Sequence, residues 1–209
     1  MNISEFVVML NGGHGSDTKG KCSDEFDADM KARHGMERLY EYWYNRKVVL
    51  AVKERLEADG FNVVHINPET NDVALNERVR RANRYCATYG IKKCVYVSIH
   101  HNASNGIGWT NASGYTAYIA NNASTRSKWL AQIFERKATE LDMLGNRWKQ
   151  TFTYNYFELK NTLCPAILTE SAFFTNKKQV DWMLSEEGFE TIVRLHVESI
   201  KEYFEKILN

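Results

Sequence analysis

The stretch CVYVSIHHN, residues 94–102, decides the fold of this chain. Its first six residues, 94–99, are mainly β-branched or aromatic, and they predict a buried strand. His100 follows this predicted strand directly. In a parallel α/β sheet, the ligand site lies beyond the carboxyl ends of the strands. The stretch therefore predicts a core strand and, at its end, a candidate site residue.

Four other short runs have the same character, and longer stretches with helical periodicity separate them. The other predicted strands are Phe6–Leu10, Asn62–Ile66, Tyr115–Ile119 and Ala166–Thr169. The predicted helices are approximately Glu37–Ala58, Val73–Tyr89, Ser124–Leu141 and Glu187–Leu208. Alternating strands and helices are typical of α/β folds. We therefore expect a twisted, mostly parallel β-sheet flanked by helices.

Composition indicates one core and no strongly charged partner. The 209 residues are 44% hydrophobic, which is enough to fill a single substantial core. Only two prolines occur, and no Gly/Ser-rich linker or internal repeat marks a boundary, so we expect a single domain over residues 1–209. The formal net charge of +1 provides no global positive field, which argues against nucleic acid as a partner.

Neither membrane insertion nor disulfide bonding is expected. No apolar run approaches the roughly 18 residues of a membrane span. The segment Met1–Leu10 lacks the basic and apolar pattern of a signal peptide, which predicts cytoplasmic synthesis without one. The cysteines at positions 22, 86, 94 and 164 have no CxxC spacing, so we expect free thiols.

Polar residues follow three of the predicted strands. The first strand runs into Asn11-Gly12-Gly13-His14-Gly15, whose glycines allow a sharp turn that brings His14 over the sheet edge. The central strand leads to His100, and the last one leads to Glu170. Each residue also has a simpler interpretation. The histidines could be hydrogen-bonded or surface residues, and Glu170 could be an exposed carboxylate or a helix-cap partner.

A fourth candidate comes from the first long helix. Glu41 and Asn45 lie in line with the apolar stripe that includes Val48 and Leu56, so both are expected on the inward face. A buried carboxylate needs a partner, and a metal ion would satisfy it. The alternative is a Glu41 that faces water because the helix begins later. Two histidines, one carboxylate and an open fourth position are typical of catalytic zinc sites.

The other histidines are not predicted to be ligands. His101 alternates with His100 along an extended segment, so its side chain should leave on the opposite face of the strand. We expect it to support the site rather than to bind the metal. Nothing comparable surrounds His34, His65 or His196, and we expect surface or packing roles for them.

Several motifs, in order along the chain, together resemble the zinc-dependent N-acetylmuramoyl-L-alanine amidases, a family that includes bacterial cell-separation amidases and phage endolysins. The resemblance extends from Val7 to Asn176. The first motif ends in Gly13-His14-Gly15, although Asn11-Gly12 replaces the usual Asp-Pro. The other matching segments are Glu41 with Asn45 and Gly60, the helix containing Asp72, Leu75, Arg78, Ala82 and Asn83, the segment Ser98–Ala103, and Pro165–Glu170 trailed by Phe174 and Asn176.

The resemblance implies a function for each candidate residue. One Zn²⁺ per chain would be bound by His14, Glu41 and His100, and Glu170 would be the catalytic acid and base. The substrate would be peptidoglycan, cleaved at the amide bond between N-acetylmuramic acid and L-alanine. Together with the expected cytoplasmic synthesis, this implies a phage or prophage lysin that acts on the cell wall after release. The alternatives are a zinc peptidase or amidase for another amide, and a non-catalytic wall-binding module. The oligomeric state stays open.

Overall fold

The computed structural model describes residues 3–106, 108–146 and 150–208. Six strands form one sheet in the order β2-β1-β3-β6-β4-β5. The strands are β1 (Val7–Gly12), β2 (Asn62–His65), β3 (Cys94–Asn102), β4 (Thr116–Ile119), β5 (Thr151–Thr153) and β6 (Ala166–Phe173). Strands β2, β1, β3 and β6 are mutually parallel. Strand β4 is antiparallel to β6, and β5 pairs with β4 in the parallel orientation. The predicted α/β class with a mostly parallel sheet is confirmed.

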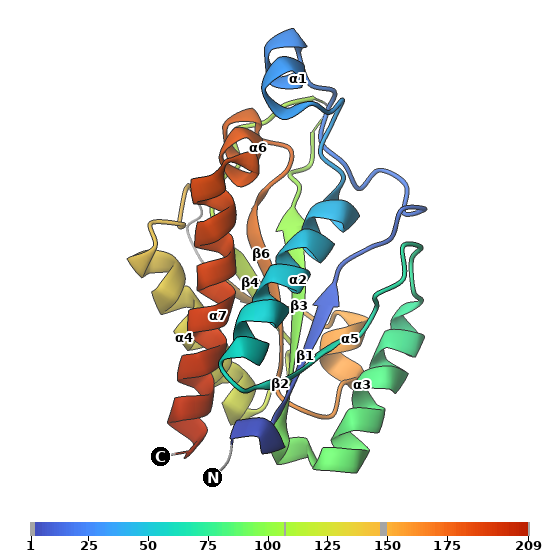
Figure 1. Cartoon of the computed structure of the whole chain (residues 1–209), viewed down its shortest axis with the longest axis vertical. Helices are drawn as coiled ribbons and strands as arrows, with labels where there is room; N and C mark the ends of the chain where they lie inside the picture. The colour runs from blue at the N-terminus through green and yellow to red at the C-terminus, as the bar shows by residue number, and fades with distance from the viewer. Residues whose placement is uncertain (1–2, 107, 147–149, 209) are drawn as a thin grey trace.

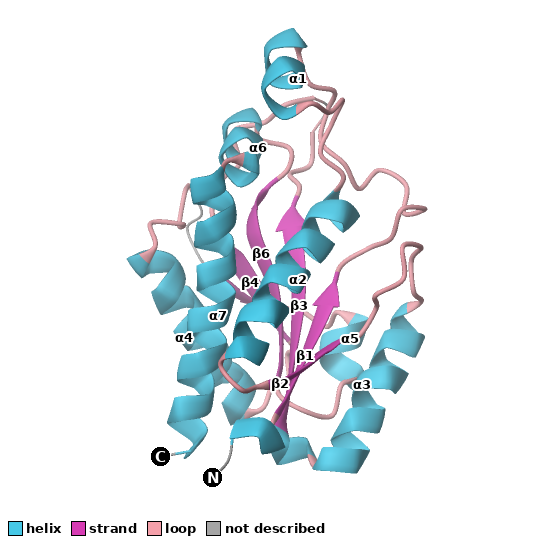
Figure 2. Cartoon of the chain, in the orientation of Figure 1, coloured by secondary structure: helices cyan, strands magenta, loops and turns pink. Residues whose placement is uncertain are grey.

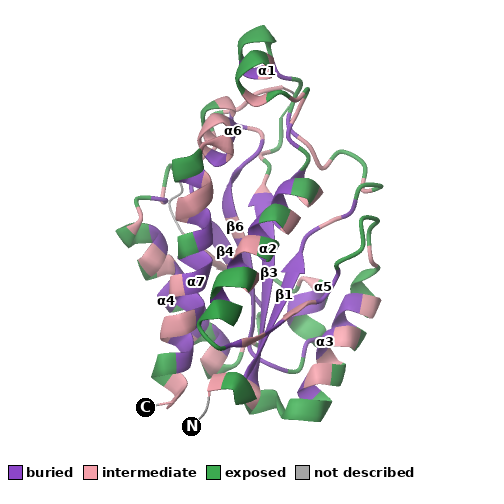
Figure 3. Cartoon of the chain, viewed as in Figure 1, coloured by how far each residue is buried: buried purple, intermediate pink, exposed green. Residues whose placement is uncertain are grey.

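Helices cover both faces of this sheet (Figures 1 and 2). They are α1 (Ala28–His34), α2 (Glu41–Ala58), α3 (Leu75–Tyr89), α4 (Thr125–Glu140), α5 (Phe157–Asn161), α6 (Lys177–Leu184) and α7 (Glu186–Leu208). Helices α2, α4, α6 and α7 share the larger hydrophobic core with one sheet face, and α3 and α5 pack in a second core on the other. The central strands are buried between these layers (Figure 3). Among the described residues, no helix is both long and apolar enough to span a membrane.

Helix α2 shows how the sequence positions the candidate site. Tyr44, Val48, Val49, Val52 and Leu56 form its buried stripe, and this stripe packs against the central strands and α7. The helix begins at Glu41, not at Glu37 as predicted, because residues 35–38 form bends and Leu39 and Tyr40 pair with the preceding loop. Glu41 therefore occupies the first turn, at the end of the helix that lies nearest the carboxyl ends of β1 and β3.

Three strands extend beyond their predicted ends. Strand β1 continues through Gly12, β3 through His100 and His101, and β6 past Thr169 through Glu170. His100 and Glu170 thus lie inside the ladder rather than after it. Polar residues ended the predicted strands, but their partners on neighbouring elements keep the backbone paired. The sequence also failed to predict β5, α1, α5 and α6, all of which are short.

Candidate active site

Three of the predicted residues meet at the carboxyl ends of β1 and β3. One potential ligand atom from each of His14, Glu41 and His100 lies within 4.8 Å of the others. His14 Nε2 is 3.2 Å from Glu41 Oε2, and His100 Nδ1 is 3.2 Å from Glu41 Oε1. Glu41 is 1% exposed, so it does not face water. The inward orientation predicted from the helix stripe is correct, and the carboxylate joins the two imidazoles.

The donor atoms of this cluster lie close enough together to share one metal ion. Each imidazole is 3.2 Å from a different oxygen of Glu41. Imidazole nitrogens and a carboxylate are ligands that Zn²⁺ accepts. Two buried atoms, Glu41 Oε2 and His100 Nε2, have no hydrogen-bond partner among the described residues. A cation would satisfy the carboxylate, which is costly to bury unpaired.

The electrostatics of Glu41 and His14 suit metal binding at neutral pH. Burial raises the pKa of Glu41, but the hydrogen bond and charge of His100 outweigh it and lower the pKa to about 2. Burial lowers the pKa of His14 to about 4, so this imidazole is neutral near pH 7. His100 is also buried, but the hydrogen bond and charge of Glu41 outweigh burial and raise its pKa. The ionised carboxylate and neutral His14 are in the forms that bind a metal.

The turn after β1 can exist only with glycines around His14. A Cβ on Gly13 would lie 2.0 Å from Cε1 of His100, and one on Gly15 would lie 1.9 Å from the backbone nitrogen of Asp72. His14 itself has φ +64°, in the left-handed region that non-glycine residues rarely adopt. The close approach of the turn to β3 therefore brings His14 to the cluster and holds its backbone in a strained conformation.

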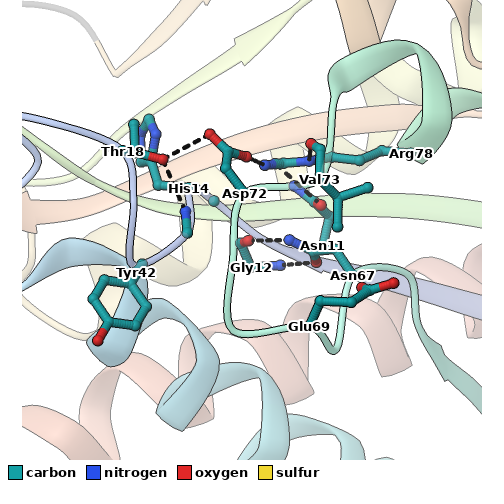
Figure 4. A network of polar contacts seen from close by, with 12 residues as sticks. Asn11, Gly12, His14, Thr18, Tyr42, Asn67, Glu69, Asp72, Val73 and Arg78 are labelled. Atoms are coloured by element: carbon teal, nitrogen blue, oxygen red, sulfur yellow. Dashed lines mark hydrogen bonds and ion pairs between the residues drawn. The ribbon is translucent and has the colours of Figure 1, made fainter.

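A network of hydrogen bonds and one ion pair stabilises this turn (Figure 4). Thr18 Oγ1 accepts a hydrogen bond from Gly15 N (3.0 Å) and donates one to Asp72 (2.6 Å). Asp72 pairs with the buried guanidinium of Arg78. Arg78 Nη1 in turn donates to Asn11 Oδ1 at 3.3 Å, and Asn11 Nδ2 donates to a serine on β3 at 2.8 Å. The network connects α3 to the loop that carries His14.

The side chain of His101 lies on the face of β3 opposite to that of His100, and it supports the metal cluster through Asn45. Its Nδ1 lies 2.7 Å from Asn45 Oδ1, and its backbone N–H donates to Glu41 Oε1 at 3.2 Å. The Asn45 amide nitrogen lies within hydrogen-bond distance of both Gly13 O (3.1 Å) and Glu41 Oε1 (3.3 Å). Burial lowers the pKa of His101 to about 3, so its ring is neutral. Asn45 and His101 therefore fix the position of Glu41 and of the His14 turn.

Glu170 lies beside His100 in the sheet. The two residues are register partners on β6 and β3, and the register then shifts by one residue before Asn102 pairs with Phe173. Such bulges re-aim side chains next to active sites. Oε2 of Glu170 is buried and has no hydrogen-bond partner among the described residues. Burial, together with the charge of Glu41, raises the pKa of Glu170 to about 8, although the charge of His100 opposes this rise.

A cavity of about 200 Å³ opens onto this cluster. It is lined by His14, Lys21, Leu75, His100, Tyr156, Phe157, Glu158, Leu168 and Glu170. A larger cavity of about 350 Å³, near Cys164, contains none of the four predicted site residues. The sequence did not single out Lys21 or Glu158. No local signal distinguished Glu158, because the segment before the Pro165–Glu170 motif mixes polar and apolar residues.

The remaining histidines lie outside this site. His34 contacts Asp181 at 2.6 Å, and His65 is on the edge strand β2. His196 is fully buried in α7, where it bonds to the side chain of Thr169 on β6 (2.9 Å). Their surroundings match the predicted surface and packing roles.

Comparison with known proteins identifies relatives that match most of the chain. The profile of the N-acetylmuramoyl-L-alanine amidase family matches residues 8–202. CwlM, an N-acetylmuramoyl-L-alanine amidase of Bacillus licheniformis, is 24% identical over 199 residues, covering 94% of this chain and 68% of CwlM. The probable cell wall amidase LytH of Staphylococcus epidermidis is 23% identical over 199 residues, covering 95% of this chain and 58% of LytH. This chain therefore spans about three fifths of LytH and two thirds of CwlM.

The fold has a counterpart among solved structures. The N-acetylmuramoyl-L-alanine amidase from Clostridium difficile 630 superimposes with a TM-score of 0.78 at 24% identity, covering 97% of this chain and 98% of that one. The same architecture therefore accommodates two sequences that differ at most positions. Since the family profile covers nearly the entire sequence, this chain belongs to the N-acetylmuramoyl-L-alanine amidase family.

Proposed function

We propose that this protein is a zinc hydrolase that cleaves the amide bond between N-acetylmuramic acid and L-alanine in peptidoglycan. One observation carries the proposal. In a chain that belongs to the amidase family, His14, Glu41 and His100 form a cluster of metal-ligand geometry, and Glu170 lies beside it in the same cavity. We assign the three clustered residues to metal binding and Glu170 to proton transfer.

A bound Zn²⁺ would polarise the scissile carbonyl and lower the pKa of a nearby water molecule. The residues of the chain supply the other requirements. Glu41 balances part of the metal charge, and the contacts of Asn45 and His101 keep that carboxylate in place. Glu170 takes a proton from the attacking water and passes it to the departing L-alanine nitrogen. Burial raises the pKa of Glu170, and a raised pKa favours handing the proton on to the departing amine.

The test combines metal analysis with identification of the products. The purified chain should contain about one Zn²⁺ and lose activity when the metal is chelated. Mass spectrometry of digested peptidoglycan should reveal stem peptides with a new L-alanine amino terminus and glycan strands without peptides. Cleavage within the stem peptide would instead indicate a zinc peptidase. Binding to the wall without any cleavage would indicate a non-catalytic wall-binding module.

A narrower hypothesis is that the enzyme acts as a phage or prophage lysin. Its test is to express the chain in the bacterial cytoplasm and then permeabilise the inner membrane with chloroform. A lysin should clear the culture only after permeabilisation, and a Glu170→Gln variant should not clear it. A culture whose turbidity stays constant while the extracted enzyme digests isolated walls would count against the lysin role.

A further inference from the structure

Glu158 is a buried carboxylate in the wall of the catalytic cavity that the proposed mechanism does not use. It occupies the first turn of α5, and its side chain is 3% exposed. It lines the same cavity as His100 and Glu170. Its Oε1 atom is buried and has no hydrogen-bond partner among the described residues. Buried carboxylate oxygens are normally hydrogen-bonded, so this atom requires an explanation.

Arg78 balances the charge of Glu158 but leaves this oxygen without a donor. Nη1 of Arg78 lies 4.0 Å from Glu158 Oε2, which is too long for a hydrogen bond. The guanidinium instead donates to Val73 O at 2.7 Å, to Asn11 Oδ1 at 3.3 Å and to Asp72. Arg78 is therefore engaged by other acceptors. The pairing makes burial of the Glu158 charge tolerable without satisfying Oε1.

The cavity beside Glu158 indicates where a donor for this oxygen can come from. Glu158 lines a cavity of about 200 Å³, next to His100 and Glu170. A substrate that fills this cavity lies against the Glu158 side chain. It must then supply a donor itself, or the complex bears the cost of an unpaired buried carboxylate.

We propose that Glu158 Oε1 accepts an amide N–H of the stem peptide and is a specificity-determining residue; this inference rests on the proposed amidase function. The ligand group is a neutral N–H, because an ammonium group would meet the cation of Arg78 4.0 Å from the carboxylate and Lys21 in the same cavity. The apolar walls formed by Leu75, Phe157 and Leu168 suit the methyl group of an alanine beside that N–H. They suit the several hydroxyls of a sugar less well.

The experiment is a double-mutant cycle between residue 158 and the substrate. Synthetic N-acetylmuramoyl peptides are prepared in which each stem-peptide amide N–H beyond the scissile bond is replaced, one at a time, by an ester oxygen. For the wild-type enzyme, one replacement should lower kcat/KM by about 10-fold or more, mainly through KM, as expected for a hydrogen bond to a charged group. In Glu158→Met, which has no acceptor, the same replacement should change kcat/KM less than about twofold.

Two further variants separate recognition from structure. Glu158→Gln keeps an acceptor oxygen and should recover part of the affinity for the normal substrate. Glu69→Met removes a glutamate that pairs with Arg81 at 2.6 Å outside the cavity, and it should leave every ester penalty at the wild-type value. Zinc content and melting temperature are measured for each variant, because a purely structural role would change stability and not the pattern of ester penalties.

The outcomes distinguish this inference from the function on which it rests. If the wild-type enzyme releases no stem peptide from any of these substrates, the proposed amidase function fails and the inference fails with it. If the wild-type enzyme cleaves them but the ester penalties are the same in Glu158→Met, only the inference is overturned. Loss of the penalty at one N–H position, with zinc content unchanged, supports it.

Discussion

His196 should make the protein less stable as the pH falls below about 6.5, although it lies outside the catalytic site. Its ring is fully buried, with Nδ1 2.8 Å from Ile192 O and Nε2 2.9 Å from Thr169 Oγ1. Burial lowers its pKa from 6.5 to about 4. Above pH 6.5 the ring is neutral in the folded and in the unfolded chain, so it does not change the free energy of unfolding. Below it, the unfolded chain binds a proton that the folded chain resists, so stability falls until the pH reaches about 4.

The size of this loss of stability follows from the change in the pKa of His196. At about pH 5 the difference in proton binding lowers the free energy of unfolding by about 2 kcal/mol relative to pH 7, and the full shift corresponds to about 3 kcal/mol. His196→Gln keeps a polar side chain but cannot be protonated in this range. Urea unfolding of the wild type and the variant between about pH 7 and pH 5 should show a loss that is smaller by about 2 kcal/mol in the variant. Any release of bound metal at low pH affects both proteins and cancels in the comparison. Equal losses in the two proteins, at unchanged urea dependence, would refute the reasoning.

Four further predictions concern the site. Glu170→Gln should retain zinc while hydrolysis falls by roughly 10² to 10⁴, checked by metal analysis and initial rates; zinc loss that excess metal repairs would reassign Glu170 as a ligand. Glu41→Gln replaces an anionic ligand by a neutral one, so zinc affinity should fall in a competition titration, and activity should return in part with excess metal. Gly13→Ala should reduce zinc content, because the added Cβ would lie 2.0 Å from the ring of His100; a full complement of metal would disprove the close approach. His101→Ala should still bind one zinc at saturation, with affinity lower by about 10- to 100-fold, since its contacts support the ligand Glu41. Complete loss of binding in the last variant would make His101 a ligand.

The sequence predicted those parts of the fold that depend on local patterns. The apolar runs of β1, β3 and β6 are recognisable because each is buried on both sides, which requires a nearly continuous set of large apolar residues. The stripe of α2 was equally clear, and with it the inward position of Glu41. Strand β5 was not predictable, since three residues at the sheet edge, paired only with β4, carry too little pattern.

The ends of the strands were misjudged for a different reason. Consecutive polar residues such as His100 and His101 usually indicate that a strand has ended. Here their side chains are satisfied by residues distant in sequence: Glu41 faces His100, and Asn45 and the ring of Tyr44 contact His101. These contacts exist only in the folded chain. Local sequence could therefore identify the candidate residues but not the continuation of the ladder through them.

Glu158 illustrates the limit of sequence reasoning most clearly, because the residue that makes its burial tolerable is 80 positions away. Arg78 is contacted from two sides: Asp72 connects it to the His14 turn, and Glu158 connects it to the wall of the cavity. Asn11, which stands where the family usually has an aspartate, accepts a hydrogen bond from Arg78 without adding a negative charge. Asp72 and Glu158 are therefore the carboxylates that balance this buried cation. The same guanidinium thus stabilises the loop that carries a metal-binding candidate and the carboxylate proposed to recognise the substrate, which couples the two sides of the catalytic cavity through one charge.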